Sequence, residues 1–162
     1  TSDGWLLSSL PAQTNRSTLQ ASVGSQIYEI ERIVEEKVSG VVFLKINAVN
    51  LPVAAFGKTQ HLQSGSQIFM IPQRNFILAT TVLGEDWGTE LVRSSEIPTR
   101  KLVVQEPLGD LSEGTPVVNL SAELVGVLVQ NSAREQTVVP FDIILHRTSE
   151  KITDTWHPHA IV

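Results

Sequence analysis

The stretch from residue 41 to residue 73 reads VVFLKINAVNLPVAAFGKTQHLQSGSQIFMIPQ. It begins with an apolar run at 41–46 and contains a second one at 66–71, both rich in the branched and aromatic residues typical of β-strands. The residues between these runs include Pro52, Gly57 and several polar side chains, which indicate turns and irregular connections. The stretch therefore predicts two strands separated by a long connection.

Similar β signals continue along the rest of the chain. Short apolar runs separated by Gly, Pro, Asn and Ser clusters recur about every 8–12 residues, a spacing that indicates a barrel or a sandwich. The further runs are 76–83, 101–104, 116–120, 124–129 and 136–140. Residues 121–123 are predicted to form the tip of a hairpin between two of them.

Residues 25–38, SQIYEIERIVEEKV, fit two interpretations. Ile27, Ile30 and Val34 follow helical spacing, and the glutamates favour a helix. Tyr28 and Ile30 also fit the alternation of a strand. The local pattern leans towards a helix.

Two further segments have clearer interpretations. Residues 84–99, GEDWGTELVRSSEIPT, are polar and contain glycine, so we expect a long surface loop. The C-terminal segment PFDIILHRTSEKI predicts a short helix, because Pro140 precedes an apolar pattern and Asp142 suits the positive end of the helix dipole.

Composition excludes several classes of function. The chain has 162 residues, 41% of them hydrophobic, and a net charge of −5 with no basic stripe, which fits nucleic-acid binding poorly. The absence of cysteine excludes disulfides, thiolate metal sites and a cysteine nucleophile. No apolar run approaches the roughly 18 residues needed to span a bilayer, and the first residues lack the layout of a signal peptide. We expect no cofactor.

Three segments together resemble the HtrA/Deg group of trypsin-like serine proteases. They are VVFLKINAVNLPVAAFGKTQHLQSGSQIFMIPQ (41–73), DGWLLSS (3–9) and SEGTPVVNLSAELVGVLVQN with the following VVPFDII. The resemblance implies an all-β fold of the chymotrypsin type, with two six-stranded β-barrels and a short C-terminal helix. It also implies that 25–38 forms strand, turn and strand instead of a helix.

The resemblance implies a division of the chain into two barrels within one trypsin-like domain. Residues 1–48 correspond to an N-terminal barrel that is incomplete, because the chain begins inside the second strand of the family. Residues 49–162 correspond to the C-terminal barrel and the helix. The family's PDZ domain is not expected within these residues.

The catalytic chemistry of the family needs a serine nucleophile, a histidine base and an aspartate that orients the histidine. Carried over position by position, the histidine falls on Pro11 and the aspartate falls on Gly40, with Glu35 and Glu36 as the nearest acids. Glu113 falls on the nucleophile when the motif is aligned on Pro116.

The loop that would stabilise the oxyanion is also altered. It corresponds to Leu111, Ser112, Glu113 and Gly114, and a β-carbon at Leu111 is expected to crowd the tight backbone that aims the amides. The resemblance therefore predicts a pseudoprotease, which is not an enzyme.

Other residues of the chain offer alternative chemistry. Ser112 is a possible nucleophile of a relocated site, and Glu113 needs a second carboxylate, such as Glu106, Asp110 or Asp86, to act as a general acid. His157 and His159, with His146 or Asp154, form a possible metal site, which we do not favour. Trp5 is expected in the core, whereas Trp87 is a possible binding residue on an exposed loop.

The resemblance implies a role in holding polypeptides. Proteases of this fold pair an extended peptide with a strand beside the site, and here that strand corresponds to Leu128, Val129, Gln130 and Asn131. We expect a polypeptide or protein partner, such as an active homologous protease or a second copy of the chain, and no nucleic acid. An active hydrolase with a relocated constellation is the alternative. The resemblance implies a location in the bacterial cell envelope, with membrane attachment only through segments outside this chain.

Overall fold

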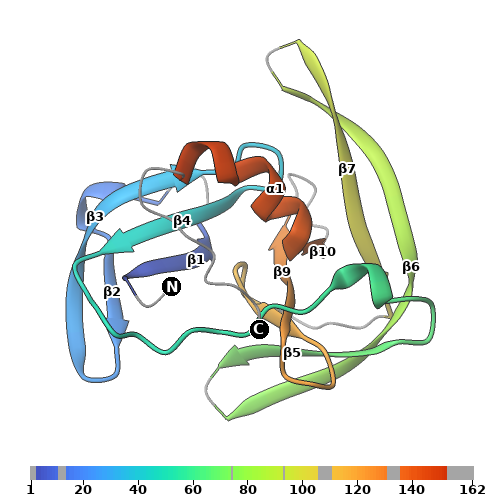
Figure 1. The fold of residues 1–162 in the computed structure, drawn as a ribbon, viewed down its shortest axis with the longest axis horizontal. Coiled ribbons are helices and arrows are strands. Elements are labelled where there is room, and N and C mark those ends of the chain that lie inside the picture. Colours follow the sequence, from blue (N-terminus) through green and yellow to red (C-terminus); the bar gives the residue numbers. More distant parts are fainter. Residues whose placement is uncertain are drawn as a thin grey trace.

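The computed structural model describes residues 3–10, 14–73, 75–92, 94–105, 111–130 and 136–152. These residues form an open four-stranded sheet and a closed six-stranded barrel, with one α-helix near the C-terminus (Figure 1). The strands are β1 (Trp5–Ser9), β2 (Gln20–Val23), β3 (Gln26–Glu35), β4 (Val41–Ile46), β5 (Gln67–Gln73), β6 (Phe76–Val92), β7 (Ser95–Val104), β8 (Pro116–Val118), β9 (Leu124–Gln130) and β10 (Gln136–Pro140). The helical elements are η1 (Arg16–Thr18), η2 (Thr59–His61) and α1 (Phe141–Ile152).

The first part of the chain forms the open sheet, with strand order β1-β4-β3-β2. All neighbouring strands in it are antiparallel. Its four strands correspond to part of a six-stranded barrel, as expected for an incomplete first barrel. The central strand β4 is buried along almost its whole length, because it has a partner on either side and apolar residues on both faces.

The helical leaning at 25–38 is wrong, and so is the expectation of two strands separated by a turn. Residues 26–35 form the single strand β3, with one turn before it, at 24–25, and another after it, at 36–40. The pairing with β4 shifts between Ile30 and Arg32, so that Ile30 lies opposite Ile46 and Ile33 lies opposite Leu44. The bulge brings Ile30 and Ile33 to one face and disturbs the regular alternation of the strand. Of the residues that suggested a helix, Ile27 is exposed and Val34 lies on the other face from Ile30.

The second part forms the closed barrel, with strand order β10-β7-β6-β5-β8-β9 and β9 paired with β10. The strands predicted at 76–83, 101–104, 116–120 and 124–129 all lie in it, with somewhat different limits. The hairpin with its tip at 121–123 is confirmed, and Ala122 there has a φ of 60°. The barrel interior is filled by branched and sulfur-containing side chains, among them Ile68, Met70, Val82, Val117, Val125, Leu128 and Val138.

The expected surface loop at 84–99 is wrong. These residues belong to a long antiparallel hairpin of β6 and β7, which are paired from Val82–Val104 to Val92–Ser95. Figure 1 shows this hairpin projecting beyond the rest of the barrel. The polar residues are compatible with strands because the projecting ribbon is exposed to solvent on much of its surface, so apolar alternation is not required there.

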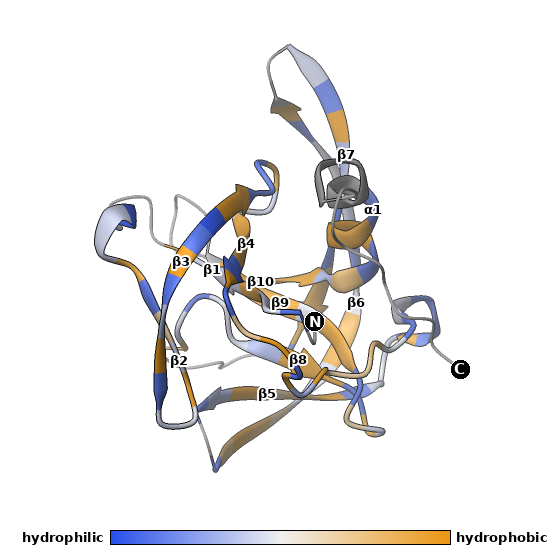
Figure 2. Cartoon of the chain, turned by 60° about the vertical axis from the view of Figure 1, so that its left-hand side comes forward, coloured by the Kyte–Doolittle hydropathy of each residue, from blue (hydrophilic) through white to orange (hydrophobic). Residues whose placement is uncertain are grey.

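A shared core joins the sheet to the barrel. Trp5, Val41 and Phe43 of the sheet pack against Val127, Val129 and Val139 of the barrel and against Phe141 and Ile144 of α1. Figure 2 shows hydrophobic residues gathered where these elements meet. Trp5 is thus a core residue, as predicted, and the predicted C-terminal helix is present and covers this junction.

Candidate functional site

Residues 112–115 form a tight turn directly before the first residue of β8. The backbone N–H and the hydroxyl of Thr115 both donate to the carbonyl of Ser112, at 3.3 and 2.6 Å. Gly114 has a φ of +81°, a value that a type II turn requires at its third position. Glycine is needed here because residues with a β-carbon avoid this conformation.

The turn lies directly against the end of β1. The hydroxyl of Ser9 donates to the carboxylate of Glu113 at 3.2 Å, and Glu113 is half-buried. A β-carbon on Gly114 would lie 2.9 Å from the backbone nitrogen of Ser9. The structure therefore brings the position of the predicted nucleophile against the last residue of β1, although the two are far apart in sequence.

A second turn, at 36–40, lies next to the same end of β1. Ser9 is opposite Val41 in the pairing of β1 with β4, and the carbonyl of Val41 accepts from the N–H of Glu36 at 2.8 Å. Gly40, the position carried over for the aspartate, closes this turn by donating its N–H to the carbonyl of Glu36 at 3.0 Å. Both turns thus lie near the same end of β1.

The buried carboxylate of Glu36 organises the second turn. It accepts from the N–H groups of Val38 and Ser39, at 3.2 and 2.7 Å, and from the Ser39 hydroxyl at 2.6 Å. Glu36 is 4% exposed, so these bonds replace water that the carboxylate has lost. Its neighbour Glu35 forms an exposed ion pair with Arg16 at 3.0 Å. Both acids nearest to Gly40 therefore have structural partners.

Leu111 contributes packing to the barrel. Its side chain is partly buried against the barrel core, and its carbonyl accepts from the side-chain amide of Gln136 at 2.9 Å. The apolar side chain therefore packs next to the turn, and the backbone carbonyl of the same residue bonds to β10. Ser112, by contrast, is exposed.

The predicted peptide-binding strand is the end of β9. The N–H of Leu128 donates to the carbonyl of Thr115 and its carbonyl accepts from the N–H of Gly114, both at 2.9 Å. Leu128 and Val129 have buried side chains, and Gln130 lies opposite Gln136 of β10. Leu128 bonds to the 112–115 turn and Val129 pairs with Thr137 of β10, so the first residue of β9 whose backbone can pair with a polypeptide is Gln130.

Several predicted site residues lie outside the described part of the chain. They are Pro11, Glu106, Asp110, Asn131, Asp154, His157 and His159. Among the described residues, no three His, Asp or Glu side chains are placed to hold a metal ion. His146 lies exposed on α1, and Asp86 lies on the projecting hairpin opposite Lys101.

Sequence reasoning missed a polar network at the base of the hairpin. The buried guanidinium of Arg100 donates to the hydroxyl of Thr59 at 2.9 Å, to Asp142 of α1 at 3.3 Å and to Glu85. It also lies 5.6 Å from the ring centre of Trp87. The hydrogen bond from Arg100 holds the pKa of Glu85 below its usual value. The signal in the sequence was that Trp87 and Leu91 fall on alternate positions counted from Glu85, as in a strand with one apolar face.

An open sheet and a closed six-stranded barrel, packed together and covered by a C-terminal helix, define the chymotrypsin-like double-barrel fold, with the first barrel incomplete. Solved structures of HtrA-type proteases share this fold.

The structure is similar to the HtrA-type protease AlgW with a decapeptide, with a TM-score of 0.64 and 14% identity over 96% of this chain and 50% of that one. It is similar to the apo MamO protease domain from Magnetospirillum magneticum, with a TM-score of 0.54 and 16% identity over 90% and 82% of the two chains. A third similar structure is an inactive serine-to-alanine mutant of Rv3671c from M. tuberculosis H37Rv, with a TM-score of 0.64 and 15% identity over 96% and 80%.

The chain thus spans half the length of the AlgW chain. No family model and no curated protein matches the sequence. Within the described ranges, no helix is long and apolar enough to cross a membrane.

Proposed function

We propose that this chain is a catalytically inactive HtrA-like serine-protease domain that binds an extended polypeptide. The observation that carries the proposal is the hydrogen bond that the carboxylate of Glu113 accepts from Ser9, in the turn that contains Gly114. The resemblance assigns the nucleophile position to Glu113, on an alignment anchored at Pro116.

The hydrogen bond between Ser9 and Glu113 stabilises the turn and provides no nucleophile for acyl transfer. A serine protease needs a hydroxyl beside a histidine base, and the resemblance assigns Pro11 to the base, a residue that has no proton-accepting side chain. Gly40 at the aspartate position likewise has no side chain to orient a base. Because triad members act as a unit, replacement of all three leaves no route to an activated nucleophile.

Binding does not require these groups. An extended polypeptide adds to a strand through backbone hydrogen bonds, and side-chain pockets then select its sequence. The backbone of Leu128 is already bonded to the 112–115 turn and Val129 is paired with Thr137 of β10, so the proposed pairing uses the chain from Gln130 onwards. The partner is an unfolded or extended segment of a protein. A location in the bacterial cell envelope is part of the proposal and rests on the family resemblance.

Hydrogen–deuterium exchange during titration with unfolded polypeptides tests the binding role. Saturable binding should slow exchange of the Gln130 amide, while the amides of strand β2 serve as the internal control. Absence of binding at every concentration, or protection spread equally over β2, would exclude the proposed mode.

Assembly with another protein chain is a second candidate function, and one observation favours it. Trp87 and Leu91 lie four residues apart on one strand of the projecting hairpin, and they are 63% and 74% exposed. Exposed large apolar residues on one strand face are typical of protein contacts. Light scattering should then give a mass above that of one chain for the wild type and a lower mass for Leu91→Lys. A monomer at all concentrations argues against self-assembly.

A further inference from the structure

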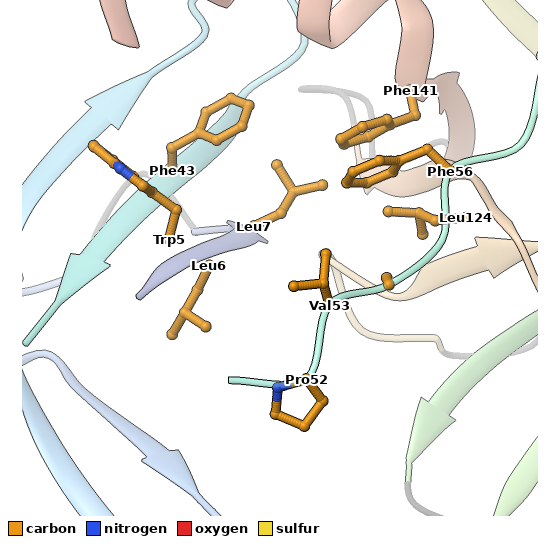
Figure 3. A pocket seen from close by; sticks show the side chains of 10 residues that line it. Trp5, Leu6, Leu7, Phe43, Pro52, Val53, Phe56, Leu124 and Phe141 are labelled. Carbon is orange, nitrogen blue, oxygen red and sulfur yellow. The ribbon is translucent and has the colours of Figure 1, made fainter. Parts of the chain in front are cut away.

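An apolar cavity of about 180 Å³ lies between the sheet and the barrel, away from the 112–115 turn. One wall is formed by Trp5, Leu6 and Leu7 of β1, and the opposite walls are formed by the connection at 52–56, by Leu124 and by Phe141 of α1 (Figure 3). The cavity therefore has walls from both halves of the fold.

The chemistry of the walls defines what the cavity can hold. Every residue that lines it is apolar, including Phe43 and the stacked rings of Phe56 and Phe141, whose centres are 4.4 Å apart. No charged side chain lines the cavity, so a charged ligand would lose hydration there without gaining an ionic partner.

The size of the cavity limits the ligand. An engineered apolar cavity of about 150 Å³ in another protein stays dry and binds benzene. The cavity here is slightly larger, so one aromatic ring with a small substituent fits it. The exposed residues Pro52, Val53 and Ala54 lie along the connection that forms its rim, which gives such a molecule a route of entry.

We propose that this cavity is a binding site for a small uncharged molecule with one aromatic ring. The ligand replaces the missing van der Waals contacts of the cavity walls and connects the sheet to the barrel. The site is separate from the proposed polypeptide site. The two are connected through β1, which lines the cavity with Trp5, Leu6 and Leu7 and contacts Glu113 through Ser9.

Titration with toluene tests the proposal, with benzoate as a charged control of similar shape. Methyl resonances of Leu7 and Leu124 should shift with saturation, whereas the exposed Leu120, which does not line the cavity, should remain unchanged. Toluene should also raise the midpoint of thermal unfolding by a few degrees, and benzoate should do neither.

A matched pair of variants locates the site. Ala54→Phe places a ring at the cavity and should abolish toluene binding, whereas Ala55→Phe adds the same ring to a neighbouring exposed residue that does not line it. Absence of saturation in the wild type, shifts at Leu120, or binding that survives Ala54→Phe would overturn the proposal. Concentration-dependent dimers that disappear in Ala54→Phe, without toluene binding, would also overturn it and would identify a second copy as the occupant.

Discussion

The two turns beside the end of β1 use their carboxylates differently. In the 36–40 turn, the carboxylate of Glu36 points back into its own loop and accepts from the N–H groups of Val38 and Ser39 and from the Ser39 hydroxyl. In the 112–115 turn, the carboxylate of Glu113 points outward and accepts from Ser9 on another strand. The first acid is part of a closed local structure, and the second connects two halves of the fold.

The same contrast holds for their glycines. Gly40 and Gly114 both have positive φ, at +73° and +81°. A β-carbon on Gly40 would meet no atom within 4 Å, whereas one on Gly114 would lie 2.9 Å from the backbone of Ser9. The turn at the position carried over for the aspartate is therefore internally stabilised and has open space beside its glycine, whereas the turn at the position carried over for the nucleophile is packed against a strand.

Glu36→Ala should have the largest effect on stability. It leaves two partly buried backbone N–H groups and a hydroxyl without their acceptor, at a cost of about 2–3 kcal/mol in the free energy of unfolding. Urea denaturation measures this loss. Glu36→Gln is the control, since it keeps one acceptor oxygen and should cost less. Equal stability of Glu36→Ala and wild type would contradict the structural role of this carboxylate.

Gly114→Ala should come next, at about 2–3 kcal/mol, because the new β-carbon meets both an unfavourable backbone conformation and the backbone of Ser9. Gly40→Ala is the matched substitution in the open turn. It meets the conformational penalty alone and should cost about 1 kcal/mol. Thermal unfolding measures both losses of stability. Equal losses for the two variants would contradict the claim that only the 112–115 turn is packed against β1.

Glu113→Ala should have a small effect, about 0.5–1 kcal/mol, because it removes one hydrogen bond from a half-buried carboxylate. Ser9→Ala removes the same bond from the other side, and a double-mutant cycle should give a coupling energy of similar size. Additive losses from the two single variants would show that the bond between the turns and β1 contributes nothing.

Glu85→Gln should give the smallest change, and the change should depend on pH. The pKa of Glu85 is lowered in the folded protein, chiefly by the hydrogen bond from Arg100, so the charged carboxylate stabilises the fold at neutral pH. That contribution is lost as pH falls through the folded pKa, below 4.5. Midpoints of thermal unfolding for wild type and variant should therefore differ at pH 7 and converge in acid. A constant difference across this range would contradict the role of Arg100.

The sequence predicts strands where dense runs of branched residues occur, in the sheet and in the barrel. The predicted limits of 41–46 and 136–140 agree with β4 of the sheet and β10 of the barrel. The prediction from the sequence fails where contacts between distant residues decide the local structure. The bulge between Ile30 and Arg32 gives β3 an apolar spacing of three. In the projecting hairpin, long-range pairs such as Trp87 with Arg100 stabilise strands that have few apolar residues.

The candidate site shows the same division. The motif around Pro116 is local, so the sequence alone identifies Glu113 as the residue of interest and predicts its turn. The partner of that residue, Ser9, is more than a hundred residues away in the chain, and no local pattern predicts such a contact. The internal bonds of Glu36 depend on a turn whose geometry becomes evident only in the folded chain.

Treatment with a biotin-linked fluorophosphonate, followed by intact-mass measurement, tests the central claim most directly, because this reagent forms an adduct with an activated serine. The account predicts no mass increase at any pH from 6 to 9, with an active serine protease as the positive control. An equimolar adduct that maps to Ser112 and is lost in Ser112→Ala would show a working nucleophile and would contradict the account.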